Sequence, residues 1–517
     1  MNYITINYHK WNKKDFMIFK KSCSEKLDIK ESQIFQPYFS LYFHIYNTKN
    51  SHSLFDMNRR FILKNIEHSS LIKYYSSNSF IKGMVYDKKY NTSHQKELFC
   101  KCIPLLDPVN IMMNNYSNMI HRNPLLPSNY NYNTHEKINN MNNTAYIDTF
   151  FSFICSEITS KDINPSFSIF YGSVNGIKKE FNYDITDEYN DFKNEEWFHK
   201  NLGKTYTLDM YVGDSLSGSS SDESNLSDFN DSPSKSHLSS RSSRSSRSSR
   251  SSRSSRSSRS SLSSNSSYNN EYVALLNNIP CQNFFIEKLE GTLEDLLDDM
   301  EKLNEELIIT CIFQISFALA YLQKHYQFTH NDLHINNIMY TKTDKEFLYY
   351  KYNNIYFKVP TYGYLFKIID FGRSIFTFHN KMFFNDTFDT HGEAEGQYTK
   401  PYHKLLFNEK LNHTEKKIIP NYNFDLCRLA ITIIEVCDID YSLNYGKKQY
   451  FVNFLYNLTI DKENNSLSHQ DDDFNMYITI AKNACSALPK LIIQYPIFYK
   501  YRIKKKMFPT KSYYKIS

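Results

Sequence analysis

The sequence predicts an α+β protein built in two parts, because strand patterns come first and helical patterns dominate afterwards. A long serine-rich tract lies between most of the strands and the helices. At 517 residues, the chain is also too long for one ordinary compact core. Hydrophobic residues make up 41% and aromatic residues 16%, which is enough apolar surface for a real core.

Strand patterns begin at residue 61, after a polar and aromatic stretch, 1–60, to which no element can be assigned. Short apolar runs then alternate with turn-rich stretches, as in an antiparallel sheet. Residues 107–142 are rich in Asn and Pro and predict an inserted loop. We expect strands at 61–66, 80–86, 98–106, 166–171, 272–276 and 283–287.

Helical spacing of apolar residues predicts a helix that begins at Asn143, with Ile147, Phe151 and Ile158 on one face. Further helices are expected at about 292–303, 305–325 and 424–437. The longest apolar run, 307–322, contains Thr, Gln and Ser and is too short to cross a bilayer comfortably, so we expect a buried core helix.

The tract at 215–270 contains seven Arg-Ser-Ser units, from Arg241 to Arg259. It has almost nothing apolar to bury, so we expect it to be disordered. Without its eight basic and four acidic residues, the chain has 53 basic and 51 acidic residues and is nearly neutral. A flexible insertion is the favoured interpretation of the tract, phosphorylation of its serines comes second, and salt-sensitive attraction to nucleic acid comes third.

Cysteine usage and the first residues predict the compartment. The nine cysteines are scattered without a metal-site spacing, which favours a reducing environment and argues against structural zinc. The first residues lack the apolar run of a signal peptide. We therefore expect a soluble, cytoplasmic protein with no membrane partner.

Two segments carry the residues with the clearest chemistry, HNDLHINNIMY at 330–340 and IIDFGR at 368–373. The tail of ATP is densely negative, and Mg²⁺, which neutralises it, prefers hard oxygen ligands. Asp370 ends an apolar strand and could bind the metal, and Asn337 offers an amide oxygen for a second metal position. Asp332, five residues before Asn337, is then free to orient an attacking hydroxyl and accept its proton.

These segments resemble the catalytic and metal-binding loops of the eukaryotic-like protein kinase superfamily. The sequence looks most like the divergent kinase-like proteins of giant DNA viruses. The Asp332-Leu333-His334 form is similar to haspin-type kinases and aminoglycoside phosphotransferases. The resemblance covers roughly residues 61–214 and 270–440.

The resemblance implies a bilobal protein-kinase-like fold, with a small antiparallel-sheet N-lobe and a mainly helical C-lobe. It assigns 61–214 to the first part of the N-lobe, 215–270 to the disordered insertion, 271–290 to the last N-lobe strands and the hinge, and 291–517 to the C-lobe. Residues 1–60 remain an unassigned extension.

The resemblance also assigns residues to the binding of ATP. Gly83 and Val85 resemble the end of a Gly-rich loop and the start of its second strand, although the two earlier glycines are missing. Lys101 stands alone in an apolar strand, as a phosphate-binding Lys should, and its charge would be costly to bury without a partner. Glu287 and Leu289 lie where the hinge contacts adenine.

The helix that follows Lys101 offers two acidic partners. Asp148 has apolar residues three and seven positions later and so faces the core, whereas the equivalent positions after Glu157 are polar. We favour Asp148 and keep Glu157 as the alternative. Asp425 resembles the helix Asp that braces the catalytic-loop backbone.

Three departures from the family pattern stand out. Asn331 replaces the usual Arg before Asp332, which favours activity without a phosphorylated activation loop. No Ala-Pro-Glu follows Asp370. About twenty extra residues at 341–366 predict an inserted hairpin that turns at Asn353 and Asn354.

The activity that the resemblance implies is ATP-dependent transfer of the γ-phosphoryl group to a Ser or Thr hydroxyl. Its cofactors would be ATP and Mg²⁺, and its partners protein substrates of unknown identity, with nucleic acid unexpected except through the Arg-Ser-Ser tract. Two alternatives stay open. One is a pseudokinase scaffold, favoured by the degenerate Gly-rich loop, and the other is a small-molecule phosphotransferase of the same fold.

Overall fold

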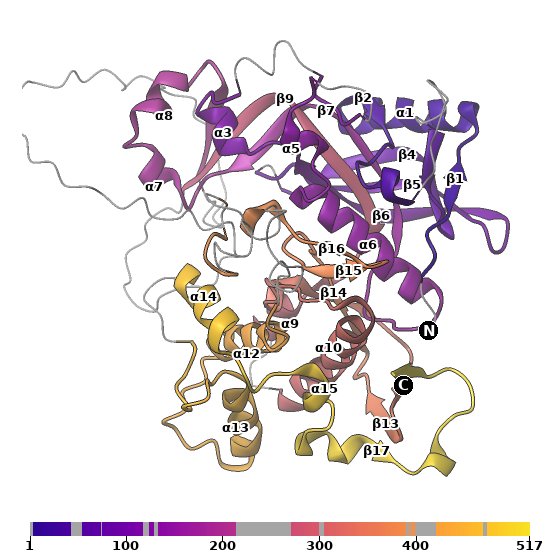
Figure 1. Cartoon of the computed structure of the whole chain (residues 1–517), viewed down its shortest axis with the longest axis vertical. Helices are drawn as coiled ribbons and strands as arrows, with labels where there is room; N and C mark the ends of the chain where they lie inside the picture. The colour runs from indigo at the N-terminus through magenta and orange to yellow at the C-terminus, as the bar shows by residue number, and fades with distance from the viewer. Residues whose placement is uncertain are drawn as a thin grey trace, which may run out of the picture.

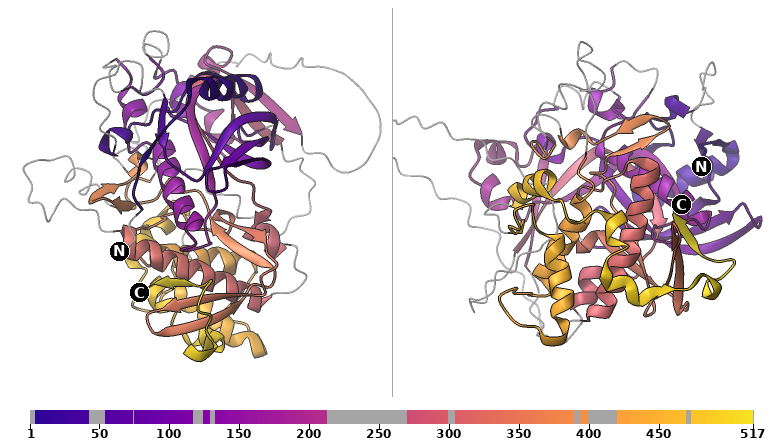
Figure 2. Two further views of the ribbon diagram at one scale, coloured as in Figure 1. Left: turned by 90° about the vertical axis from the view of Figure 1, so that its right-hand side faces the viewer. Right: turned by 60° about the horizontal axis from the view of Figure 1, so that its bottom comes forward.

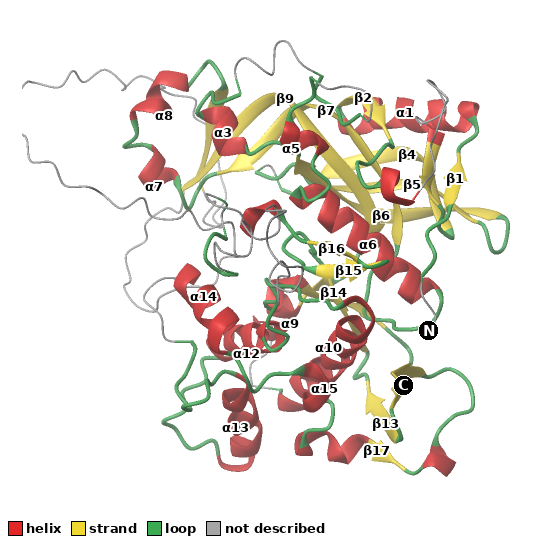
Figure 3. Cartoon of the chain, viewed as in Figure 1, coloured by secondary structure: helices red, strands yellow, loops and turns green. Residues whose placement is uncertain are grey.

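The computed structural model is an α+β protein in which strands gather in one part and most long helices in the other. The largest group of strands occupies the upper part of Figure 1, with several helices around it, and Figure 3 shows a second group of helices with a few strands below. The same separation persists in the turned views of Figure 2. The structure describes residues 4–42, 54–73, 75–116, 124–128, 133–212, 270–298, 304–388, 392, 394–398, 420–468 and 473–516, so the predicted disorder of 215–270 lies outside the described residues except at its last residue.

The upper part is built on one seven-stranded antiparallel sheet. Its strands follow the order β2-β7-β9-β6-β5-β4, and β8 pairs with the far end of β9. The long strand β9 pairs with β6, β7 and β8 and so holds the sheet together. In chain order the strands are β2 (Ile29–Gln33), β4 (Phe61–Leu71), β5 (Ser79–Asp87), β6 (Thr92–Pro104), β7 (Phe170–Asp184), β8 (Tyr206–Val212) and β9 (Asn270–Glu287).

Helix α1 (Lys13–Leu27) covers one face of this sheet. Its buried Phe16, Phe19 and Leu27 pack in one cluster with Leu98 and Phe285 from the sheet. The helix begins at the Asn12 cap and ends where Asp28 takes a left-handed conformation. The N-terminal residues, unassigned from sequence, therefore add a covering helix to the sheet. They also form β1 (Tyr8–Lys10), which pairs with β3 (Phe55–Met57), and the short helix α2 (Phe39–Tyr42).

Helix α6 (Thr144–Ser160) covers the opposite face, where it contacts β7 and β9. Its side chains share a cluster with Phe170, Phe284 and Ile286. We call these two surfaces the α1 face and the α6 face. The predicted loop at 107–142 contains two short helices, α3 (Pro108–Met112) and α5 (Glu136–Asn139), and two more, α7 (Tyr189–Phe192) and α8 (Glu196–Asn201), precede β8.

Helix α10 (Glu305–Tyr326) is the centre of the lower part. It is long and apolar enough to cross a membrane by composition, but 89% of its most apolar window is buried inside the protein, which confirms the predicted core helix. Around it lie α9 (Leu293–Asp298), α12 (Phe424–Val436), α13 (Gln449–Leu458), α14 (Asp473–Asn483), α15 (Pro489–Ile492) and the 3₁₀ turns η2 (Ile335–Asn337), η3 (Asp386–Phe388), η4 (Gly446–Lys448), η5 (Pro496–Tyr501) and η6 (Lys505–Met507).

The inserted hairpin predicted at 341–366 is confirmed. Strands β12 (Phe347–Tyr352) and β13 (Ile355–Pro360) pair antiparallel, and Asn353 is left-handed in the turn, with φ of 51°. The hairpin is flanked by two strands near the end of the chain, β17 (Arg502–Ile503) on β13 and β18 (Tyr514–Ile516) parallel to β12. The remaining strands are β10 (Gly291–Thr292), β11 (Ile338–Lys342), β14 (Tyr364–Ile368), β15 (Phe376–Phe378) and β16 (Lys381–Phe383).

Two strand predictions need correction. The strands expected at 272–276 and 283–287 form one continuous strand, β9, because Asn277 and Ile279 both pair with β7. Asn278 between them has a φ of 54° but does not end the strand. The strand expected at 166–171 begins only at Phe170.

Candidate active site

Strands β11 and β14 bring the two predicted loops together. Ile338 pairs with Ile368 in antiparallel register, so Asn337, before β11, and Asp370, after β14, lie at the same end of the pair. The amide of Ile369 donates to the carbonyl of Asn337 over 3.1 Å. Asp370 is left-handed, with φ of 63°, and 42% of its side chain is exposed and open to a ligand.

The Asn337 side chain ties Asp332 into the same site. Its Nδ2 donates to the Asp332 carbonyl over 2.8 Å and lies 3.0 Å from Nε2 of His334. The amide oxygen of Asn337 is therefore on the other side of the group from these two contacts. Burial lowers the pKa of His334 to about 4, so this histidine is neutral at physiological pH.

Asp425, at the start of α12, holds the backbone of this loop from below. Its fully buried carboxylate accepts the amides of His330, at 3.0 and 3.1 Å, and of Asn331, at 3.0 Å. Burial raises the pKa of Asp425, and the nearby His330 and the two amides oppose that rise. The predicted bracing role of Asp425 is confirmed.

Lys101 reaches from the α6 face of the sheet to two carboxylates. Its Nζ lies 2.7 Å from Asp148 Oδ2 and 2.8 Å from Asp370 Oδ1. Burial would lower the pKa of Lys101, but the two carboxylates outweigh it and raise the pKa. Burial would likewise raise the pKa of Asp370, but the charge of Lys101 holds it below its usual value. Lys101 is therefore a firmly charged cation beside Asp370.

Asp148, the partner favoured from the sequence, is the helix acid that contacts Lys101. It is fully buried, whereas Glu157, two and a half turns later, pairs with Lys161 over 3.3 Å. Burial raises the pKa of Asp148, and the charge of Lys101 opposes the rise. The face prediction from neighbouring apolar residues thus distinguishes the two acids correctly.

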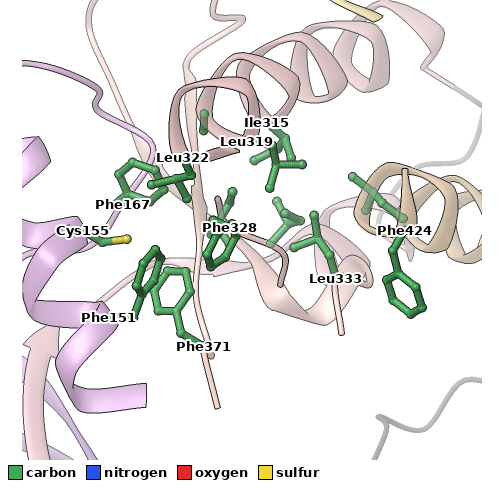
Figure 4. Packing of buried hydrophobic residues seen from close by; sticks show 14 of the residues in the cluster. Phe151, Cys155, Phe167, Ile315, Leu319, Leu322, Phe328, Leu333, Phe371 and Phe424 are labelled. Carbon is green, nitrogen blue, oxygen red and sulfur yellow. The ribbon is translucent and has the colours of Figure 1, made fainter. Parts of the chain in front are cut away.

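Aromatic packing fixes α6 against the loop that contains Asp370. The amide of Phe371 donates to Asp148 Oδ1 over 2.9 Å. Phe151 stacks on Phe328, with ring centroids 4.5 Å apart, and meets the edge of Phe371 at 5.1 Å, as Figure 4 shows. The position of Asp370 consequently depends on how α6 packs.

The structure places Gly83 and Val85, the residues predicted to contact the nucleotide, away from Lys101. Gly83 pairs with Lys96, five residues before Lys101 on β6, about 16 Å along the strand. Val85 lies in the cluster on the α1 face, so its side chain points away from Lys101. Gly83 has a structural role instead, since a Cβ there would lie 2.5 Å from the carbonyl oxygen of Asn65.

Asn78, at the end of the connection between β4 and β5 (residues 72–78), lies beside Lys101 instead. Ser79 pairs with Cys100, and the Asn78 side chain accepts the amide of Cys102 over 2.9 Å. Phe80 and Phe99 follow on the α6 face, with ring centroids 6.1 Å apart. These aromatic residues were not predicted, because alternation along a strand shows which residues share a face of the sheet. It does not show whether that face is covered by α1 or by α6.

Glu287 and Leu289 lie at the junction between the two parts. The Glu287 carboxylate accepts from Lys367 Nζ over 2.6 Å and from the amide of Ile169 over 3.2 Å. Its side chain therefore ties the end of β9 to β14. Leu289 is 8% exposed and lies in the short connection to β10.

Asp332 also receives a contact that sequence reasoning missed. The hydroxyl of Tyr477, on α14, donates to Asp332 Oδ1 over 2.6 Å, and Arg373 Nη1 lies 3.9 Å from the same oxygen. The two partners of this hydrogen bond are 145 residues apart in the chain, and no local pattern points from one to the other.

The site offers a cation, three carboxylates and an amide within one network. In the part of the chain that the structure describes, no group of three or more His, Cys, Asp or Glu side chains is placed to hold a metal alone. Mg²⁺ commonly takes only one or two protein oxygens and completes its shell with water and phosphate oxygens, so Asn337 and Asp370 fit this ion. The arrangement suits the binding and transfer of a phosphoryl group.

No protein-family model matches the chain. It is 29% identical over 162 residues to the serine/threonine-protein kinase haspin homolog of Drosophila melanogaster, covering 31% of this chain and 27% of that protein. It is 38% identical over 104 residues to an Acanthamoeba polyphaga mimivirus protein whose name assigns it provisionally to the serine/threonine-protein kinases, covering 19% of this chain and 24% of that protein.

An uncharacterized protein of Invertebrate iridescent virus 6 is 36% identical over 87 residues, which is 16% of this chain and 14% of that protein. The matches thus span about a quarter or less of the length of these relatives. The similarity to kinase-named proteins of a fly and a mimivirus supports a divergent, protein-kinase-like relationship of this chain to those proteins.

Proposed function

We propose that the chain is an ATP-dependent protein kinase that transfers the γ-phosphoryl group to a Ser or Thr hydroxyl of a protein. The observation that carries this proposal is the network that links Lys101, Asp370, Asn337 and Asp332 through direct contacts and paired strands. The names of the fly and mimivirus relatives support the kinase class.

The proposal includes a bilobal kinase fold. The sheet with α1 and α6 would form the N-lobe, the helices around α10 would form the C-lobe, and the nucleotide would lie between them. The chain crosses from one part to the other at Leu289, and the ion pair of Lys101 with Asp370 joins the two parts directly. Phe80 and Phe99 are then suited to pack against adenine on the α6 face, since their flat rings complement a purine.

In this proposal, each polar residue has one task. Lys101 holds the α- and β-phosphates, and Asp148 keeps its ammonium charged and oriented. Asp332 orients the acceptor hydroxyl and takes its proton as the bond to the γ-phosphorus forms and ADP leaves. Leu289 and the backbone of Glu287 remain candidates for adenine contacts.

Asn337 and Asp370 would hold Mg²⁺, which supplies positive charge against the phosphate oxygens. Lys101 contacts Asp370 Oδ1, and the exposed remainder of that carboxylate is available for the ion. The pKa of Asp370 lies below its usual value, so the carboxylate is ionised and competent as a ligand at neutral pH.

One observation favours a second candidate, a binding scaffold that retains the fold. The connection at 72–78, which ends at Asn78 beside Lys101, has the sequence IKYYSSN and contains no glycine, so its backbone is less free to wrap phosphates. A small-molecule phosphotransferase is the third candidate, based on the Asp-Leu-His form alone.

Transfer from γ-labelled ATP to a mixture of proteins and to a panel of hydroxyl-bearing metabolites, assayed side by side, separates the three. The proposal expects label on Ser or Thr of proteins that depends on Mg²⁺. Label only on metabolites would favour the small-molecule enzyme. Mg-ATP binding without any transfer, in wild type and in Asp332→Asn alike, would favour the scaffold.

A further inference from the structure

Helix α14 places a tyrosine hydroxyl directly on the carboxylate of Asp332. The Tyr477 hydroxyl donates to Asp332 Oδ1 over 2.6 Å, and the tyrosine is only 2% exposed. Burial, helped by the charge of Asp332, raises the pKa of Tyr477 to about 12, so the hydroxyl keeps its proton at neutral pH. Asp332 therefore faces a fixed donor with no net charge.

Neighbouring side chains clamp the Tyr477 ring. The guanidinium carbons of Arg373 and Arg428 lie 5.6 and 5.1 Å from its centroid, and both arginine side chains are at most 10% exposed. Phe424 packs against the ring at 5.9 Å. Since a buried ring packed against three side chains cannot readily swing its hydroxyl away, these neighbours support the contact with Asp332.

Other groups near Asp332 are less well placed to hold its carboxylate. The two ring nitrogens of His334, two residues later, lie against the amide of Asn336 and the side chain of Asn337. Arg373 is 3.9 Å from Oδ1, which is beyond hydrogen-bond length. Tyr477 thus supplies a short hydrogen bond where these neighbours do not.

We propose that Tyr477 is a positioning residue for Asp332. Its hydroxyl fixes Oδ1, so that Oδ2 is presented to the acceptor hydroxyl in one orientation. A carboxylate accepts hydrogen bonds on both oxygens, so this contact leaves room for a substrate. Fixing a base in reacting geometry raises the rate of the chemical step more than it changes nucleotide binding. This inference rests on the proposed kinase activity.

Tyr477→Phe tests the proposal, because it removes the hydroxyl and keeps the ring between Arg373 and Arg428. We expect kcat for phosphoryl transfer to fall by about 10- to 100-fold, as for the loss of one hydrogen bond to a charged group. The KM for ATP, the affinity for Mg-ATP and the thermal midpoint should stay close to wild type. Tyr501→Phe is the matched control: its buried hydroxyl contacts Thr310 at 3.2 Å, and kcat should be unchanged.

A double-mutant cycle separates positioning from a general structural effect. In an Asp332→Asn background, single-turnover rates should fall by less than about twofold when Tyr477→Phe is added, because the carboxylate through which Tyr477 acts is already gone. If Tyr477→Phe lowers the rate by the same factor in the Asp332→Asn background as in wild type, the proposal is overturned.

Four other results would also overturn it. A wild-type kcat in Tyr477→Phe would show that Tyr477 does not position Asp332. A higher kcat would show that the Tyr477 hydroxyl blocks the position of the acceptor hydroxyl. Label mapped by mass spectrometry to Tyr477 itself would make it an acceptor. If wild type transfers no phosphoryl group at all, the proposed function fails and this inference fails with it, whereas a normal wild type with an unaffected Tyr477→Phe overturns the inference alone.

Discussion

Lys101 contacts two carboxylates from different parts of the molecule, Asp148 on α6 and Asp370 after β14. The ammonium is firmly charged because these partners outweigh the effect of its burial. Removing one of the two carboxylates leaves the buried ammonium of Lys101 with a single negative partner. An incompletely paired charge is costly in free energy in a poorly solvated site.

Asp148→Asn tests this pair. We expect kcat/KM for ATP-dependent transfer to fall by about 10- to 100-fold, because a charge-assisted hydrogen bond to Lys101 is lost. Glu157→Gln on the same helix is the control, since Glu157 pairs only with Lys161 among the contacts described here, and its kcat/KM should stay within about twofold of wild type. Equal losses in both variants would contradict the assignment of Asp148.

His9 gives a pH dependence of stability that can be measured apart from activity. Burial and the charge of Lys88 lower the pKa of His9 from 6.5 to about 4. Between these two values the unfolded chain binds more protons than the folded one, so the free energy of unfolding decreases as pH falls. The loss between pH 7 and pH 5 in chemical unfolding should be smaller in His9→Gln than in wild type.

The control for this measurement is His94→Gln, in which an exposed histidine on β6 is replaced. This variant should lose as much stability as wild type over the same pH interval. A His9→Gln protein with the full wild-type loss would show that His9 does not titrate differently on folding.

At the scale of elements, strand β5 shows where sequence reasoning reaches its limit. The strand itself was predicted within one residue at each end, but Val85 points to the α1 face and Gly83 sits in the middle of the strand. Strand periodicity is visible in the sequence, whereas the choice of face depends on which helix covers which side. In α6, by contrast, apolar neighbours of Asp148 revealed its face.

Gly83→Ala distinguishes a structural glycine from a nucleotide-binding one. The new Cβ would lie 2.5 Å from Asn65 O and 2.8 Å from Leu63 Cδ1, so we expect a loss of about 1–3 kcal/mol in the free energy of unfolding. The KM for ATP of the folded variant should remain that of wild type. A raised KM for ATP with an unchanged free energy of unfolding would indicate that Gly83 contacts the nucleotide.

The C-terminal strand β18 stabilises the inserted hairpin, because it pairs in parallel with β12 and buries Ile516. Ile516→Ala should lower the free energy of unfolding by about 2–4 kcal/mol, measured by urea denaturation. Lys515→Ala, one residue earlier and exposed, should change it by less than about 0.5 kcal/mol. Similar effects from both variants would contradict the described pairing.

For the whole molecule, the described residues on either side of 213–269 lie together. Val212, at the end of β8, pairs with Asn270, at the start of β9, in an antiparallel register that runs on to Tyr206 and Leu276. The chain therefore leaves the sheet and returns to it at neighbouring positions. This geometry supports the interpretation of the tract as an insertion that the fold tolerates.

Replacing residues 213–269 with a short Asn-Gly turn should leave the thermal midpoint within a few degrees of wild type and keep phosphoryl transfer intact. Circular dichroism and the labelling assay measure the two properties. Loss of transfer in a normally folded deletion variant would show that the tract contributes to activity.

Much of the structure could be predicted from the sequence because the patterns that indicate it lie within short segments of the chain. The catalytic and metal loops, Lys101 and the hairpin at 341–366 each have a short motif or an alternation of their own. Residues 1–60 lack such a pattern, and α1 acquires its role only by packing on a sheet made of later strands. Tyr477 reaches Asp332 through the tertiary fold alone.

The proposed activity depends most on Asp370, which would hold Mg²⁺ against the phosphates. Its most direct test is phosphate transfer from γ-labelled ATP with Mg²⁺, comparing wild type with Asp370→Ala under identical purification. We predict labelling by wild type that disappears in Asp370→Ala while the fold, followed by circular dichroism, is kept. Equal labelling by the two proteins would contradict the account, since the activity would then come from elsewhere.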